Sequence, residues 1–134
     1  MTPQELIAIA VSAMDKAYAP YSGFQVGAAL LCSDGTVYTG CNIENAAYSP
    51  TNCAERTALF KAVSEGRRDF TAIAICGGKN GKVTNLCPPC GICRQVLREF
   101  CKDDFPVYLA HKEGYKALPL GDLLPYSFGV DSLK

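Results

Sequence analysis

A chain of 134 residues has the usual length of one domain, so we expect a single domain over residues 1–134 with one hydrophobic core. Its thirteen basic and thirteen acidic side chains cancel, which argues against nucleic acid as a partner. The apolar stretch from Leu6 to Met14 is too short to span a bilayer, so no membrane partner is expected. Eight cysteines without a secretory signal favour reduced thiols and a cytoplasmic location.

The first predicted elements are a helix and a hairpin. Thr2 and Glu5 have the spacing of a capping box, so a helix is expected to begin there and to run to about Tyr18. Two segments rich in apolar and β-favouring residues, 24–32 and 36–41, flank a Ser-Asp-Gly sequence. This arrangement predicts two antiparallel strands joined by a tight turn.

The rest of the chain alternates predicted helices and strands. Thr51 or Asn52 is expected to cap the second helix, and a polar loop is expected over residues 77–89. The link from His111 to Gly114 is too short for a parallel crossover, so the last two strands should pair antiparallel. The predicted helices cover residues 52–66 and 90–101, and the predicted strands cover 70–76, 105–110 and 115–118. The fold class that follows is mixed α/β, with a mainly five-stranded sheet covered by helices.

Two cysteines at the start of the third predicted helix have the spacing of metal ligands. Cys90 and Cys93 lie three residues apart, and residues at that spacing project from the same face of a helix. Two thiolates on one face can bind one metal ion. The same spacing also occurs in redox pairs, in structural zinc ribbons and among small core residues, so a third ligand must decide.

Cys53 is the best candidate for that third ligand. It stands at the start of the second predicted helix, and Glu55 follows two residues later. A structural zinc site is normally closed by four protein ligands, whereas a catalytic site leaves one position for water. Three strong candidates therefore indicate an open, catalytic zinc site, with Glu55 as an acid beside the metal. Cys87 is the alternative fourth ligand that would close the site.

Helix geometry limits where the metal can lie. Positions 53 and 55 are about 200° apart around an ideal helix, so both can face one metal only if it lies beyond the helix end. Both helices would then direct their positive N-terminal ends at the thiolates. Arg56 and Arg94, which each follow a ligand motif, are expected to donate to the sulfurs; the alternative is that both occupy solvated helix faces.

Four segments of the chain resemble the small homotetrameric cytidine deaminases. They are Phe24-Gln25-Val26-Gly27-Ala28-Ala29-Leu30, Gly40-Cys41-Asn42-Ile43-Glu44-Asn45-Ala46, Cys53-Ala54-Glu55-Arg56 and Pro89-Cys90-Gly91-Ile92-Cys93-Arg94-Gln95. The last two match the general zinc-deaminase signature, in which x-Glu is followed by Pro-Cys-x-x-Cys and the first ligand is His or Cys. The resemblance covers nearly the whole chain and implies a cytidine deaminase-like three-layer sandwich.

The resemblance also implies an activity and a set of residue roles. One Zn²⁺ per subunit would be bound by Cys53, Cys90 and Cys93, with Glu55 as the proton carrier. The substrates would be cytidine and deoxycytidine, converted to uridine and deoxyuridine with release of ammonia in pyrimidine salvage. The residues expected to contact substrate are Phe24, Asn42, Glu44, Ala54 and, from a neighbouring subunit of a homotetramer with shared active sites, Phe128.

Three other functions remain open at this point. A deaminase of a cytosine-bearing antibiotic such as blasticidin S would share the zinc and glutamate elements, but Asn42 and Glu44 favour a ribose. A deaminase that edits nucleic acid would need a basic groove, which this neutral chain lacks. A structural zinc module would explain the cysteines but would leave Glu55 without a role.

Overall fold

Six strands form one mixed sheet in the computed structural model, which describes residues 1–134. The strands are β1 (Gln25–Cys32), β2 (Val37–Cys41), β3 (Phe70–Lys79), β4 (Lys82–Val83), β5 (Pro106–His111) and β6 (Gly114–Pro119). Five of them follow one another across the sheet in the order β2-β1-β3-β5-β6, and β4 pairs with β3 beside that path. The predicted mixed α/β class is confirmed, with one strand more than the five expected.

The directions of the strands follow from their connections. Short turns join β1 to β2 and β5 to β6, and both pairs are antiparallel, as predicted. The chain passes from β3 to β5 through a helix, α3 (Gly91–Phe100), and these two strands are parallel. β1 and β3 are also paired, and this pair is antiparallel. The strands β1, β3 and β5 therefore lie inside the sheet, and β2 and β6 form its two edges.

The expected loop over residues 77–89 is partly wrong. β3 continues to Lys79 and turns back through Asn80 and Gly81 into the two-residue strand β4. Asn80 and Gly81 have φ values of 56° and 73°, the left-handed conformation that two-residue hairpin turns require. A strand of two residues is too short to show any alternation of polar and apolar side chains, so the sequence pattern did not reveal it.

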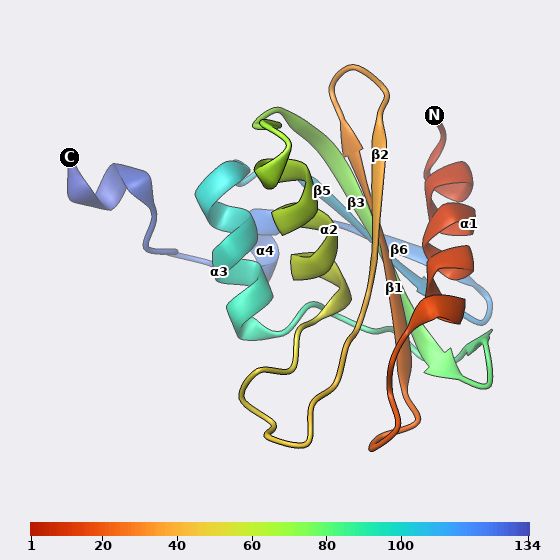
Figure 1. The fold of residues 1–134 in the computed structure, drawn as a ribbon. Helices are drawn as coiled ribbons and strands as arrows, with labels where there is room; N and C mark the ends of the chain where they lie inside the picture. Colours follow the sequence, from red (N-terminus) through yellow and green to blue (C-terminus); the bar gives the residue numbers. More distant parts are fainter.

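Helices cover both faces of the sheet and make it the middle of three layers (Figure 1). α1 (Pro3–Ala13) lies on one face, whereas α2 (Ala54–Ser64) and α3 lie on the other. The predicted capping box of α1 is present, but the α-helix ends at Ala13 and a 3-10 turn, Met14–Lys16, replaces its expected last turn. Two short elements, α4 (Leu120–Leu123) and the 3-10 turn Val130–Leu133, follow the sheet. None of the helices combines the length and the hydropathy that crossing a bilayer would require.

The close approach of α2 to the sheet depends on a glycine in β2. A Cβ atom at Gly40 would lie 2.2 Å from the carbonyl oxygen of Ala54 and 2.6 Å from the backbone nitrogen of Ala58. Contacts that short are sterically forbidden, so only glycine allows the first turn of α2 to rest on this strand. Ala54 and Ala58 are fully buried there. The N-terminal end of α2 is therefore held in a fixed position against the sheet.

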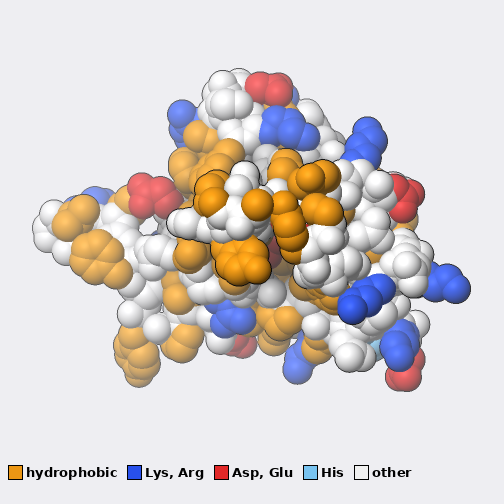
Figure 2. Space-filling view, turned by 60° about the horizontal axis from the view of Figure 1, so that its bottom comes forward, with side chains coloured by type: hydrophobic (Ala, Val, Ile, Leu, Met, Phe, Trp, Pro, Cys, Tyr) orange, Lys and Arg blue, Asp and Glu red, His pale blue; other side chains and the backbone are white.

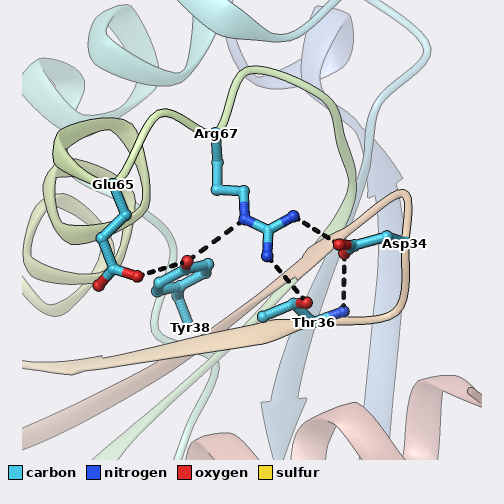
Figure 3. Close-up of polar contacts among 5 residues, drawn as sticks. All are labelled: Asp34, Thr36, Tyr38, Glu65 and Arg67. Carbon is cyan, nitrogen blue, oxygen red and sulfur yellow. Dashed lines mark hydrogen bonds and ion pairs between the residues drawn. The ribbon is translucent and has the colours of Figure 1, made fainter.

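The other end of α2 is held by a polar network around Arg67 (Figure 3). The guanidinium donates to Asp34 and Thr36 in the β1–β2 turn and to the hydroxyl of Tyr38 on β2. The same hydroxyl donates to Glu65 at the C-terminal end of α2 over 2.9 Å. Every polar side chain of the network has a partner, and the network joins the end of the helix to the hairpin.

Candidate active site

Three cysteines meet where α2 and α3 begin. Cys53 is the N-cap of α2, Cys90 is the N-cap of α3, and Cys93 is in the first turn of α3. The sulfur of Cys90 lies 3.7 Å from that of Cys53 and 3.4 Å from that of Cys93, and all three lie within 4.8 Å of one another. α2 thus begins at Ala54, two residues later than the expected start at position 52, and Cys53 occupies the capping position predicted for Thr51 or Asn52.

The spacing of the sulfurs fits a tetrahedral metal ion. Zinc binds thiolates at about 2.3 Å, which places two ligands of a tetrahedron about 3.8 Å apart. The two shorter sulfur separations, 3.4 and 3.7 Å, are close to that value. Both helices direct the positive ends of their dipoles at the cluster, which favours anionic ligands. The cluster is therefore positioned to bind one metal ion with a thiolate ligand set.

One of the three thiols gives up its proton most readily. Hydrogen bonding from Cys93 is the main cause that lowers the pKa of Cys53 to about 5, and Arg56 and Cys90 contribute in the same direction. The same contact with Cys53 raises the pKa of Cys93. The cluster thus already favours one thiolate, and a divalent cation deprotonates the thiols that coordinate it.

The two arginines expected beside the sulfurs have different surroundings. Arg56 donates from Nη2 to the sulfur of Cys53 over 3.2 Å, and its buried Nε has no hydrogen-bond partner. Arg94 instead donates from Nε to the carbonyl of Pro89 over 2.7 Å and from Nη1 to the carbonyl of Leu123 over 2.8 Å. The expectation that Arg94 donates to a sulfur is therefore wrong: two carbonyls, one of them on α4, attract its guanidinium. Arg94 fixes the backbone that leads into Cys90.

Glu55 is a buried carboxyl group beside the cysteines. It is the second residue of α2, and only 4% of its surface is exposed. Burial raises its pKa to about 7, and the nearby charge of Cys53 acts in the same direction. No side chain of another residue donates a hydrogen bond to this carboxyl group. A carboxyl group with such a pKa can accept and release a proton near neutral pH.

Cys87, the alternative fourth ligand, does not join the cluster. Its sulfur lies over Gly77, where an added Cβ atom would be 2.9 Å from it and equally close to the ring of Phe24. Burial raises the pKa of Cys87 to about 11, so it remains a neutral thiol. The metal-binding cluster of the chain consists of three residues. Three protein ligands are the arrangement of a catalytic zinc site.

The residues expected to contact substrate lie on segments next to the cysteines. Ala54 is the first residue of α2 and is fully buried beside Cys53. Phe24 immediately precedes β1 and is half-buried. Asn42 follows β2 and holds the start of β1: its Oδ1 accepts from the backbone nitrogen of Val26, and its Nδ2 donates to the carbonyl of Phe24, each over 2.8 Å. The amide of Asn42 thus fixes the backbone that carries Phe24.

Backbone pairing connects these segments to the metal cluster. Ile43 forms isolated β-bridges with Tyr18 on one side and with Asn52 on the other. Asn52 directly precedes Cys53, and its side chain donates to Thr57, whose hydroxyl in turn donates to the carbonyl of Cys53. Sequence reasoning missed Asn52 and Thr57 as supports of the site, because single polar residues near a helix start carry no specific pattern. The ladder fixes the loops and Cys53 relative to one another.

Phe128 lies on an exposed C-terminal tail that extends away from the sheet (Figure 1). Its side chain is 60% exposed, while its carbonyl accepts a hydrogen bond from Gln95 of α3 over 2.8 Å. Hydrophobic side chains also gather on the face shown in Figure 2, the lower side of Figure 1. The two loops on that side contribute four exposed hydrophobic residues: Tyr18, Tyr21, Ile43 and Tyr48.

Comparisons with known proteins give a consistent result. The family model described as "Cytidine and deoxycytidylate deaminase zinc-binding region" matches residues 1–109. The chain is 52% identical to the cytidine deaminase of Sporosarcina psychrophila, over 99% of this chain and 96% of that protein. It is also 52% identical to the cytidine deaminase of Halalkalibacterium halodurans, over 99% of this chain and 98% of that protein.

Solved structures agree with these relatives. The crystal structure of cytidine deaminase from Burkholderia pseudomallei superposes with a TM-score of 0.88 at 48% identity, covering 96% of this chain and all of that one. The structure from Mycobacterium tuberculosis gives a TM-score of 0.82 at 41% identity, covering 97% and 99% of the two chains. The extent of these matches and the zinc-compatible cysteine cluster lead to one conclusion: the chain belongs to the cytidine deaminase family.

Proposed function

We propose that the protein hydrolyses the ring amino group of cytidine and deoxycytidine, giving uridine or deoxyuridine and ammonia, and that it serves pyrimidine salvage. The observation that carries this proposal is the buried carboxyl group of Glu55 beside three cysteines that fit one zinc ion. A purely structural zinc site has no need of such a group. The eight free cysteines support a reducing, cytoplasmic location.

Glu55 moves the protons of the reaction. Zinc, when bound by the three cysteines, supplies Lewis-acid activation of the attacking water. The carboxylate of Glu55 accepts a proton from that water and passes it to the ring nitrogen next to the amino-bearing carbon, which makes this carbon electrophilic. The oxygen of the deprotonated water adds to this carbon and makes it tetrahedral. The remaining proton of the new hydroxyl then passes through the same carboxyl group to the amino group, the C–N bond breaks, and ammonia leaves. Burial raises the pKa of Glu55 to about 7, which suits a carboxyl group that both accepts and releases protons near neutral pH.

The neighbouring loops orient the nucleoside. The amide of Asn42 has two N–H donors and two acceptor lone pairs, of which the β1 backbone uses one each, so a sugar hydroxyl can use the others. Glu44 offers a carboxylate to the sugar, and the ring of Phe24 forms a wall of the pocket. The backbone N–H of Ala54 belongs to the first turn of α2, where N–H groups have no partner within the helix. That N–H is suited to hold the base.

The substrate class can be tested by adding a phosphate. The family region that matches this chain also covers deoxycytidylate deaminases, so a nucleotide is the second candidate substrate. A carboxylate at Glu44 close to the sugar repels a phosphate dianion, which favours the free nucleoside. We expect the zinc-loaded protein to turn over cytidine and deoxycytidine with a much higher kcat/KM than their 5′-monophosphates. Equal kcat/KM values would replace the nucleoside assignment by a nucleotide one, and zinc binding without any turnover would indicate a structural module.

We also propose that the active form is a homotetramer in which Phe128 of one chain covers the base bound by another. The exposed apolar tail and the hydrophobic face of Figure 2 support this assembly, because surfaces of that kind mark contacts between proteins. A Phe128→Ala chain and a Glu55→Gln chain should each be impaired. Mixed tetramers should recover activity at sites where an intact Glu55 meets an intact Phe128. A fully active monomer, or verified hybrids without recovery, would contradict shared sites.

A further inference from the structure

The carboxylate of Glu44 is held by donors from one short segment. Its Oε1 accepts from the backbone nitrogens of Tyr21 and Ser22 over 3.0 and 3.1 Å, and its Oε2 accepts from the hydroxyl of Ser22. The hydroxyl of Ser22 is the main cause that lowers the pKa of Glu44, so the group is an ionised acceptor. Two carboxylate oxygens offer about four acceptor positions. Three are occupied, which leaves one for a ligand.

The hydroxyl of Ser22 also fixes the backbone at Phe24. It accepts a hydrogen bond from the backbone nitrogen of Phe24 over 3.0 Å while it donates to Glu44. Gly23, between them, has a φ of +69°, a left-handed conformation that glycine adopts without strain. One hydroxyl therefore joins the carboxylate expected to contact the sugar to the residue expected to form the wall of the pocket.

We propose that Ser22 is a positioning residue for sugar recognition, which acts by orienting Glu44 and Phe24 together. This inference rests on the proposed function, because it assumes that Glu44 accepts a hydrogen bond from a sugar hydroxyl. With three donors in place, the carboxylate presents its remaining acceptor position in one direction before the substrate arrives. Such pre-organisation reduces the entropy lost on binding and keeps the base aligned with the reacting groups.

Removal of the Ser22 hydroxyl should weaken binding more than chemistry. In a Ser22→Ala chain, Glu44 loses one charge-assisted hydrogen bond and the backbone nitrogen of Phe24 loses its acceptor. We expect kcat/KM for cytidine to fall about tenfold, mainly through KM, the size expected for one hydrogen bond to a charged group. Ser22→Thr keeps a hydroxyl and should recover most of the activity, whereas Ser22→Cys keeps the volume but is a weak donor and should not.

The matched control is Ser64→Ala. The hydroxyl of Ser64 donates one hydrogen bond to the carbonyl of Lys61 at the C-terminal end of α2, at the opposite end of that helix from the cysteines. The control should leave KM and kcat for cytidine unchanged. Zinc content and the thermal midpoint, measured for all four variants, show whether any loss of activity comes from loss of metal or of folding.

A panel of substrates separates positioning from general damage. The Glu44→Gln chain is first assayed with cytidine, 2′-deoxycytidine and 3′-deoxycytidine, and the analogue least affected identifies the hydroxyl that Glu44 binds. Ser22→Ala should lose about tenfold with the substrates that retain this hydroxyl, and about twofold or less with the analogue that lacks it.

Two results would overturn the proposal. Equal losses for all three substrates in the folded, zinc-loaded Ser22→Ala and Ser22→Cys chains would show that Ser22 does not act through the sugar. Full activity of Ser22→Ala would show that the hydroxyl is dispensable. A zinc-loaded wild-type protein that does not deaminate cytidine would instead remove the proposed function itself, and the inference with it, before any variant is compared.

Discussion

Polar side chains are fully hydrogen-bonded at one end of α2 and incompletely hydrogen-bonded at the other. At the C-terminal end, Arg67 and the hydroxyl of Tyr38 form a network in which each side chain has a partner within the chain. At the N-terminal end, the buried carboxyl group of Glu55 receives no hydrogen bond from another side chain, and the buried Nε of Arg56 has no partner. Native proteins rarely leave buried polar groups unpaired. The carboxyl group of Glu55, whose hydrogen bond comes only from its own backbone, and the unpaired Nε of Arg56 therefore mark the end of α2 that has hydrogen-bonding capacity left for a ligand.

The comparison also separates stability from activity. A fully paired network lowers the free energy of the folded chain, and it has no free donor or acceptor with which to bind a ligand. Unpaired buried groups cost stability but can respond to a metal ion or a substrate. Substitutions at the C-terminal end of α2 should therefore change the free energy of unfolding and leave activity unchanged. Substitutions at the N-terminal end should change activity more than the free energy of unfolding.

The largest expected effect is the loss of the metal in a Cys90→Ser chain. The sulfur of Cys90 lies 3.7 Å from that of Cys53 and 3.4 Å from that of Cys93, and its removal leaves two ligands, which do not suffice for tight binding. Zinc content should fall from about one ion per chain to near zero, with loss of essentially all activity. Cys87→Ser is the matched control and should retain both. Full zinc retention by Cys90→Ser would show that Cys87 replaces it.

The next largest effect should come from Glu55→Gln, which removes the proton carrier and keeps the three cysteines. We expect an unchanged zinc content and a fall in kcat of about 100-fold or more. Glu65→Gln, at the other end of the same helix, is the matched control and should retain its kcat, because the carboxyl group of Glu65 accepts its hydrogen bond from Tyr38, away from the cysteines. Near-normal turnover by a zinc-loaded Glu55→Gln chain would remove this carboxyl group from the mechanism.

The elements predicted correctly are those with local signals. The capping box of α1 and the tight turn between β1 and β2 depend on a few adjacent residues, and both are present. The misplaced start of α2 has a different cause. Asn52 was a plausible cap, but its backbone pairs with Ile43 and its side chain donates to Thr57, so tertiary contacts moved the capping position to Cys53.

The residues of the site likewise fall into those that local sequence indicated and those that only the fold brings together. Cys90 and Cys93 lie at the N-terminal turn of α3, so their spacing indicated that both sulfurs could face one metal, although redox pairs and core cysteines have the same spacing. The fold brings Cys53 to them, and its place at a predicted helix start, close to Glu55, indicated this in the sequence. The guanidinium of Arg94 turns to a carbonyl 29 residues away in α4, which no local pattern can reveal. The contacts of Ser22 with Glu44 likewise join residues that are 22 positions apart.

A smaller effect, on stability alone, is expected for Tyr38→Phe. The ring stays in the core, but the hydroxyl that links Glu65 to Arg67 is lost. Removing one hydrogen-bonding hydroxyl from a buried position costs about 1 kcal/mol of the free energy of unfolding. Urea unfolding of the zinc-loaded protein should report this change, while kcat and KM for cytidine stay the same. A parallel loss of activity would contradict the separation of the two ends of α2.

The smallest expected effect concerns pH and Asp34. The backbone N–H of Thr36 and the guanidinium of Arg67 lower the pKa of this carboxyl group from 3.8 to about 2. Since the folded-state pKa lies below the unfolded one, ionised Asp34 stabilises the fold above about pH 4, and this contribution is lost as the pH falls from about 4 towards 2. Asp34→Asn removes the charge but keeps an oxygen for Thr36. The urea midpoints of the two chains should therefore differ most at pH 6 and converge towards pH 2.5. Zinc dissociates from both chains in acid, and the difference between them cancels that shared loss. A difference that stays constant over this pH range would show that the charge of Asp34 does not stabilise the network around Arg67.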